Sequence, residues 1–136
     1  MTDDLRAYEV AVVGGGPAGL TAALYTTRLS HDTVVINRGG GRAAMMQEVH
    51  NLLGVTEETS GGEFLGIGRE QLEDYGCEMY RDMVTTCSRT DDERITLSGN
   101  SASYSAERVV LATGFNDVRP DPPLPRTGRG LHYCLH

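Results

Sequence analysis

The stretch "VVGGGPAGL", Val12–Leu20, places four glycines and one proline directly after the apolar run "YEVAVV". The near-continuous hydrophobicity of residues 8–13 predicts a strand covered on both faces, as in the interior of a parallel sheet. A helix is predicted from about Pro17 to Leu29, because proline suits the first helical turn and apolar residues follow at helical spacing. The run "TVVI", Thr33–Ile36, predicts a second strand, so the chain opens with a strand-helix-strand unit.

Gly14, Gly16 and Gly19 form the pattern G-x-G-x-x-G at the strand-to-helix junction of this unit. The first glycine of such a pattern permits a tight turn, the second lets a pyrophosphate approach the backbone, and the third lets helix and strand pack closely. The N-terminus of the helix offers N–H groups and the positive end of its dipole to the anion. We therefore predict an α/β, Rossmann-like domain that binds a dinucleotide.

The residues after the second predicted strand leave the identity of the dinucleotide open. An acidic residue usually binds the ribose at this place, but here Asn37 and Arg38 occupy it. Asn37 can hydrogen-bond a ribose hydroxyl, whereas Arg38 could pair with a 2′-phosphate. The motif by itself is therefore compatible with NADP as well as with FAD.

The rest of the chain predicts a loop, a second helix and several short strands. Residues 37–55 predict a loop with at most a short helix, and a helix is expected from about Gly62 to Tyr75, where Gly76 ends it. The strand candidates that follow are "CEMYRDMVT" (77–85), "RITLS" (94–98), "SASYSA" (101–106) and "RVVLA" (108–112). We expect the last of these beside the first strand in a mostly parallel sheet flanked by helices, and the others in a small antiparallel meander.

Composition excludes several classes of partner. The formal net charge of −7 argues against nucleic acid, which needs a basic protein face. The apolar runs are far too short to span a bilayer and the N-terminus lacks the basic start of a signal peptide, so we expect a cytoplasmic protein without a membrane partner. The three cysteines are widely spaced and match no zinc or disulfide pattern, so no metal site is predicted.

Four segments in order resemble the FAD-binding part of the thioredoxin reductase family of pyridine nucleotide-disulfide oxidoreductases. They are "VVGGGPAGLTAALYTTRL" (12–29), "GGRAAMMQEVHNLLGV" (40–55), "VVLATG" (109–114) and "GRGLHYC" (128–134), which together reach across nearly the whole chain. The family commonly has glutamine where this chain has Arg42, and an aromatic residue and proline where it has Leu52 and Leu53. The resemblance favours FAD as the cofactor.

The resemblance also implies which residues bind FAD. The first group would hold the pyrophosphate and the ribose, the second would lie along the flavin, and the third would contact adenine and close over the cofactor. The first group is Gly14, Gly15, Gly16, Pro17, Ala18, Gly19, Asn37 and Arg38; the second is Gly40, Gly41, Arg42 and Asn51; the third is Met83, Val84, Ala112, Thr113 and Gly114. Apart from the resemblance, Met46 could touch the flavin, because a thioether packs well on an aromatic ring, or it could serve in loop packing alone.

Cys134 falls on the first cysteine of the family's C-x-x-C redox pair, and the resemblance implies that it is catalytic. Its partner would stand at position 137, beyond the 136 residues of the chain, and a dithiol couple requires two thiols. We expect residues 1–116 to be the N-terminal part of an FAD-binding domain. Residues 117–136 hold four of the five prolines, and we expect them to be a linker and the start of a missing NAD(P)H and redox domain.

The resemblance as a whole implies a fragment of a flavoenzyme that passes electrons from NAD(P)H through FAD to a disulfide. The acceptor would be thioredoxin or another protein disulfide, and the family commonly forms homodimers. Two alternatives stay open. One is a non-catalytic module that binds or senses FAD, and the other is an NADP-binding domain that uses Arg38.

Overall fold

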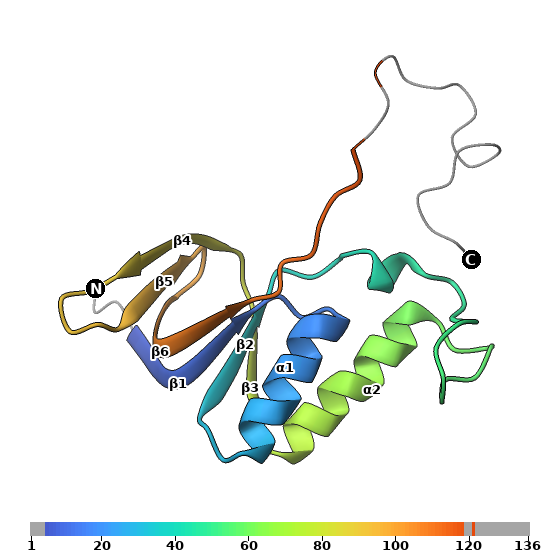
Figure 1. Cartoon of the computed structure of the whole chain (residues 1–136), viewed down its shortest axis with the longest axis horizontal. Coiled ribbons are helices and arrows are strands. Elements are labelled where there is room, and N and C mark those ends of the chain that lie inside the picture. Colours follow the sequence, from blue (N-terminus) through green and yellow to red (C-terminus); the bar gives the residue numbers. More distant parts are fainter. Residues whose placement is uncertain (1–4, 119–120, 122–136) are drawn as a thin grey trace.

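A computed structural model of the chain describes residues 5–118 and 121 (Figure 1). Strands alternate with helices in the first half, and strands alone occupy the second half. In chain order the elements are β1 (Leu5–Val13), α1 (Pro17–Arg28), β2 (Thr33–Asn37), the short 3₁₀ helix η1 (Ala43–Met45), α2 (Gly61–Asp74), β3 (Glu78–Arg81), β4 (Val84–Arg89), β5 (Ile95–Gly99) and β6 (Ser103–Leu111).

The strands form one six-stranded mixed sheet in the order β3-β2-β1-β6-β5-β4. β2 and β6 pair with β1 in parallel, and β3 pairs with β2 in parallel. β5 pairs antiparallel with both β4 and β6. The chain therefore passes from β1 to β2 and β3 on one side, and returns to the other side of β1 through β6.

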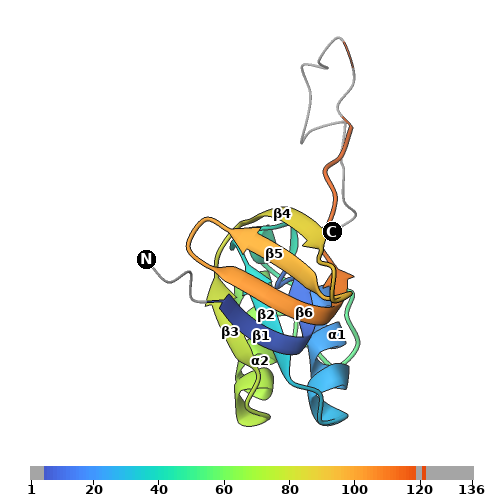
Figure 2. The same cartoon turned by 90° about the vertical axis from the view of Figure 1, so that its left-hand side faces the viewer.

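The sheet separates two apolar clusters, because successive side chains of β1 and β2 point to opposite faces of the sheet. Val12 and Val35 pack with Leu20 of α1 and Leu72 of α2 on the helical face. Figure 1 shows both helices on this side and the strands β4 and β5 on the other side. On the second face the side chains of Val34, Ile36, Leu97 and Tyr104 form a cluster with Tyr8. Figure 2 shows β4 and β5 alongside β6 as they approach that face. The parallel strands are thus covered on both sides.

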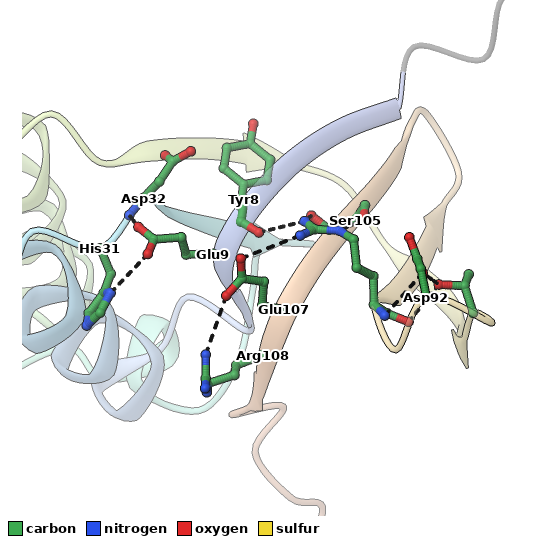
Figure 3. Close-up of polar contacts among 10 residues, drawn as sticks. Tyr8, Glu9, His31, Asp32, Asp92, Ser105, Glu107 and Arg108 are labelled. Atoms are coloured by element: carbon green, nitrogen blue, oxygen red, sulfur yellow. Dashed lines mark hydrogen bonds and ion pairs between the residues drawn. The ribbon is translucent and has the colours of Figure 1, made fainter.

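β1 bends at Glu9, and polar contacts hold the bend (Figure 3). The N–H groups of Glu9 and Val10 both donate to the Asp32 carbonyl at 3.0 Å. The Glu9 carboxylate in turn accepts from the Asp32 N–H at 2.6 Å and lies 3.3 Å from His31 Nδ1. Arg94 donates to the Tyr8 carbonyl at 2.9 Å and to Ser105 Oγ at 2.7 Å. These contacts fasten the turn before β2 and the meander to the same strand.

The structure confirms the predicted fold class and corrects two strand assignments. Residues 77–85 form two strands instead of one, because the chain leaves the pairing with β2 at Arg81 and joins β5 from Val84, with Asp82 and Met83 between the two strands. β3 joins the parallel part of the sheet instead of the meander. Residues 103–111 form a single strand, β6, where two were expected, and its first half pairs with β1 and β5 together.

Within the described residues, no helix has the length and apolarity needed to cross a membrane.

A capping box sets the start of α2. The Ser60 hydroxyl accepts from the Glu63 N–H at 3.1 Å, and the Glu63 carboxylate accepts from the Ser60 N–H at 2.8 Å. The bond from the Ser60 N–H also lowers the pKa of the Glu63 carboxyl group, and the nearby Ser60 side chain is the second cause. Two of the unpaired N–H groups at the helix start are thereby satisfied.

We predict that Ser60→Ala lowers the free energy of unfolding by about 1 kcal/mol, the usual cost of losing such a cap. Urea denaturation followed by circular dichroism measures this change. Ser88→Ala is the matched control, because Ser88 is exposed on β4, and its effect should stay within about 0.5 kcal/mol. Equal effects of the two substitutions would show that the cap does not stabilise α2.

Candidate dinucleotide-binding site

The glycine turn after β1 brings three backbone segments into close contact. The Gly14 N–H donates to the Ile36 carbonyl at 2.9 Å, and the Ala112 N–H donates to the Val13 carbonyl at 2.8 Å. Gly14 has φ +113°, and a Cβ there would lie 2.1 Å from the Ala112 carbonyl oxygen. Only glycine fits this position, because both the backbone conformation and the adjacent main chain exclude a side chain.

Gly19 and Gly16 differ in what surrounds them. A Cβ on Gly19 would lie 1.9 Å from the Gly14 carbonyl oxygen, so Gly19 is what allows α1 to pack directly on the turn. No atom lies within 4 Å of a Cβ built on Gly16, and its φ of −80° and ψ of −173° are open to any residue. The fold does not need glycine at position 16, and the open space beside it is what an approaching ligand requires.

The N-terminus of α1 faces this open space. Gly16 is the N-cap and makes no side-chain hydrogen bond, and the first turn contains no acidic residue. The Leu20 N–H donates to the Gly16 carbonyl at 3.0 Å, so the N–H groups of Ala18 and Gly19 precede the first intrahelical bond. Pro17 and Ala18 are exposed. The helix therefore presents N–H donors and the positive end of its dipole beside Gly16.

The end of β2 lies against the same turn. A Cβ on Gly15 would lie 2.5 Å from Asn37 Cγ, so the Asn37 side chain covers the glycine turn. Asn37 Oδ1 accepts from the Gly39 N–H at 3.0 Å, and its carbonyl accepts from the Asp82 N–H at 3.2 Å. Arg38 follows with an exposed side chain. Asn37 thus links the glycine turn to the end of β3.

Arg42 connects the loop after β2 with the segment after β6. Its guanidinium forms an ion pair with the Asp117 carboxylate, and its central carbon lies 4.7 Å from the centre of the Phe115 ring. Both contacts are favourable for a guanidinium, the second as a cation–π interaction. Gly40 and Gly41 precede Arg42 with φ values of +72° and +98°. The two loops are therefore cross-linked at the edge of the sheet.

The remaining predicted residues lie on the connections around this edge. Met46 is half-buried, and its carbonyl accepts from the Gly61 N–H at 2.8 Å, which docks the loop on the start of α2. Asn51 is exposed in the connection between η1 and α2. Met83 and Val84 follow the end of β3, the first exposed and the second half-buried. Ala112, Thr113 and Gly114 follow the end of β6.

These positions place most of the predicted residues at the carboxyl ends of parallel strands. The turn at Gly14 follows β1, Asn37 ends β2, Met83 follows β3, and Ala112 follows β6. Figure 1 shows the chain leaving β6 at the edge of the sheet where α1 starts. The chain order reverses between β1 and β6, and open α/β sheets bind ligands outside the carboxyl ends of their strands at such a point.

Comparison with known proteins identifies the family. Residues 8–135 match the family described as Pyridine nucleotide-disulphide oxidoreductase. The chain belongs to this family. The thioredoxin reductase of Peptoclostridium litorale is 34% identical over 131 residues, which are 93% of this chain and 41% of that protein. The thioredoxin reductase of Aquifex aeolicus is 31% identical over 135 residues, or 95% of this chain and 41% of that protein. The chain spans about two fifths of the length of these relatives.

Solved structures from the same family share the fold. A thioredoxin reductase from Gloeobacter violaceus has a TM-score of 0.76 at 32% identity, over 80% of this chain and 35% of that one. The atypical thioredoxin reductase TRi from Desulfovibrio vulgaris Hildenborough has a TM-score of 0.74 at 31% identity, over 83% of this chain and 38% of that one. Four fifths or more of this chain therefore has the same fold as these thioredoxin reductases.

The cysteines of this family member divide into two groups. Cys134, the predicted catalytic cysteine, lies outside the described residues. Cys77 and Cys87 are free thiols. Burial raises the pKa of Cys77, which keeps it as an unreactive thiol. Among residues 5–118 and 121, no group of three His, Cys, Asp or Glu side chains is arranged to hold a metal ion.

Three residues at this edge were not foreseen from the sequence. Asp117 and Phe115 hold Arg42, and Asp82 links β3 to the meander. Asp82 lies in the segment "CEMYRDMVT" beside the charged residues Glu78 and Arg81, so nothing in the local pattern marked it as buried. The partners of Arg42 are distant in sequence and could not be read from spacing.

We predict that Gly16→Ala and Gly19→Ala have opposite consequences. Gly16→Ala should leave the free energy of unfolding within about 0.5 kcal/mol of wild type, yet weaken dinucleotide binding at least about tenfold, since its methyl group occupies the open space. Gly19→Ala should destabilise the fold by about 1–3 kcal/mol or more, because its methyl group meets the Gly14 carbonyl. Urea denaturation and ligand titration measure the two quantities, and a Gly16→Ala variant that unfolds or binds normally contradicts the assignment.

Proposed function

We propose that this chain is the FAD-binding part of a flavoprotein disulfide oxidoreductase of the thioredoxin reductase kind. The observation that carries the proposal is the open space at Gly16, where the N-terminus of α1 faces outward from a turn that is otherwise closely packed. Membership of the family and the named relatives support it. Residues 1–116 would be the FAD-binding domain, and 117–136 the linker and the start of the next domain.

In this proposal the residues at the sheet edge bind successive parts of FAD, starting at the turn after β1. The N–H groups of Ala18 and Gly19 would receive the pyrophosphate, and Asn37 would hydrogen-bond the ribose next to it. Met83 and Val84 would lie against the adenine. On the other side Gly40, Gly41, Arg42, Met46 and Asn51 would line the flavin, and Ala112, Thr113 and Gly114 would close over the cofactor.

When bound, FAD supplies the two-electron chemistry between a nicotinamide and a disulfide. In the proposed reaction NAD(P)H is oxidised and a disulfide is reduced to two thiols. The chain's own part in this is to hold and orient the dinucleotide through backbone N–H groups. Cys134 would be one thiol of the redox pair, and the second thiol and the NAD(P)H site would lie in the longer protein. The acceptor would be thioredoxin or another protein disulfide. A homodimer and a cytoplasmic location belong to the same proposal.

We predict that the purified chain binds one FAD with a dissociation constant in the micromolar range or tighter, about −8 kcal/mol. Quenching of FAD fluorescence on titration measures it, and the complete gene product should purify with a flavin absorption spectrum. Absence of flavin binding in both proteins would exclude the proposal.

NADP serves as the competing ligand in the same titration. The exposed Arg38 is the group that would bind its 2′-phosphate. FAD has no such phosphate, so Arg38→Ala should change FAD affinity less than about threefold. Tighter binding of NADP than of FAD, lost in Arg38→Ala, would instead identify an NADP-binding domain.

We predict that Arg42 acts on FAD through its ion pair with Asp117. The two side chains are 33% and 31% exposed, and partly exposed pairs contribute about 0.2–1 kcal/mol. Arg42→Gln and Asp117→Asn should therefore each weaken FAD binding by about two- to fivefold, and the double variant should be no weaker than the single ones. A loss confined to Arg42→Gln would show that Arg42 acts on the cofactor without the ion pair to Asp117.

A further inference from the structure

Asp82 is a buried carboxylate in the two-residue connection between β3 and β4, with 6% of its surface exposed. Its Oδ1 accepts from the N–H groups of Met83 at 2.8 Å and Ser101 at 3.1 Å. Its Oδ2 accepts from the Ala102 N–H at 3.2 Å and the Tyr104 hydroxyl at 3.0 Å. Burial by itself opposes ionisation, but these donors outweigh it, and the pKa of Asp82 is lowered. Asp82 is therefore charged at neutral pH.

The main chain around Asp82 is fixed from two sides. The Asp82 N–H donates to the Asn37 carbonyl at the end of β2, at 3.2 Å, and the Met83 carbonyl accepts from the Asn100 N–H at 3.1 Å. A Cβ on Gly99 would lie 2.1 Å from Asp82 Oδ2, so the carboxylate fills the space that Gly99 leaves. This connection is thus held to β2 by its backbone and to the residues before β6 by the Asp82 carboxylate.

The fixed backbone at Met83 carries a side chain that a ligand can reach. Its N–H and its carbonyl are both hydrogen-bonded, yet its side chain remains 47% exposed. It follows the end of β3, as Asn37 ends β2 and Gly14 follows β1, so the three positions form a row along neighbouring strand ends. A nucleotide whose pyrophosphate lies at the glycine turn and whose ribose lies at Asn37 reaches Met83 next. A thioether side chain packs well against an aromatic ring.

We propose that Asp82 is a positioning residue for the adenosine end of the dinucleotide, which it serves by fixing Met83 as the apolar surface on which the adenine packs. This inference rests on the proposed function. It predicts that the network is needed for one end of the ligand only.

FAD, FMN and ADP separate the two ends of the ligand. FMN carries the flavin end without adenosine, and ADP carries adenosine without the flavin. In Asp82→Asn, an amide NH₂ replaces a carboxylate oxygen among groups that donate hydrogen bonds to it. Asp82 and Met83 should therefore be held less tightly. We expect Asp82→Asn and Met83→Ala to weaken FAD and ADP binding by about tenfold while FMN affinity stays within about twofold of wild type.

Asp92→Asn is the matched control, because Asp92 also accepts hydrogen bonds within a turn, from Thr90 and the Arg94 N–H, but lies between β4 and β5. It should leave the affinities for all three ligands unchanged. If Asp82→Asn does not fold, Tyr104→Phe removes a single donor and should weaken FAD and ADP binding by about two- to threefold, and Met83→Ala completes the test.

The outcomes distinguish this inference from the proposed function. A parallel loss of FMN, FAD and ADP binding in folded variants would assign Asp82 a general structural role and overturn the inference. Unchanged FAD and ADP affinities in folded Tyr104→Phe and Met83→Ala would also overturn it. A wild-type chain that binds neither FAD nor FMN would overturn the proposed function itself, and this inference with it.

Discussion

The close contact of three backbones at the end of β1 determines the rest of the structure. The Gly14 turn lies between the end of β2 and the exit of β6, and α1 starts against it at Gly19. Side chains at Gly14 and Gly19 would separate these segments. Because positions 14 and 19 carry no side chains, the N-terminus of α1, which is the positive end of its dipole, lies where the chain order of the sheet reverses. The anion-binding geometry and the strand order therefore have the same cause.

The antiparallel meander of β4, β5 and β6 supports the end of the candidate site that lies at β3. The parallel strands need cover on the face away from the helices, and Leu97 and Tyr104 supply it by packing with Val34 and Ile36. Covering that face with a mobile hairpin would leave the end of β3 unsupported. The Asp82 carboxylate prevents this by accepting from the backbone before β6, so that the cover and the strand end form one body.

The sequence predicted the first half of the fold better than the second, for a physical reason. The strand-helix-strand unit from Tyr8 to Ile36 is specified by local signals, namely apolar runs, Pro17 and the glycine turn. The strands β3, β4 and β5 are short and largely exposed or half-buried, so pairing with distant partners decides them. β3 was misplaced in the meander because its parallel neighbour, β2, lies more than forty residues earlier in the chain. The candidate site residues came from the glycine motif and the family resemblance, whereas the contacts that hold them, such as Arg42 with Asp117, are long-range.

The charge of the chain limits how this site can attract a dinucleotide. The formal net charge of the chain is −7, so its long-range field opposes the approach of an anionic ligand. Arg42 does not reverse this locally, because Asp117 pairs with it. In the proposed site, binding would then depend on short-range donors, the N–H groups of the first turn of α1, whose influence falls off within that turn. The phosphate would have to approach the backbone closely, and the open space at Gly16 permits that approach.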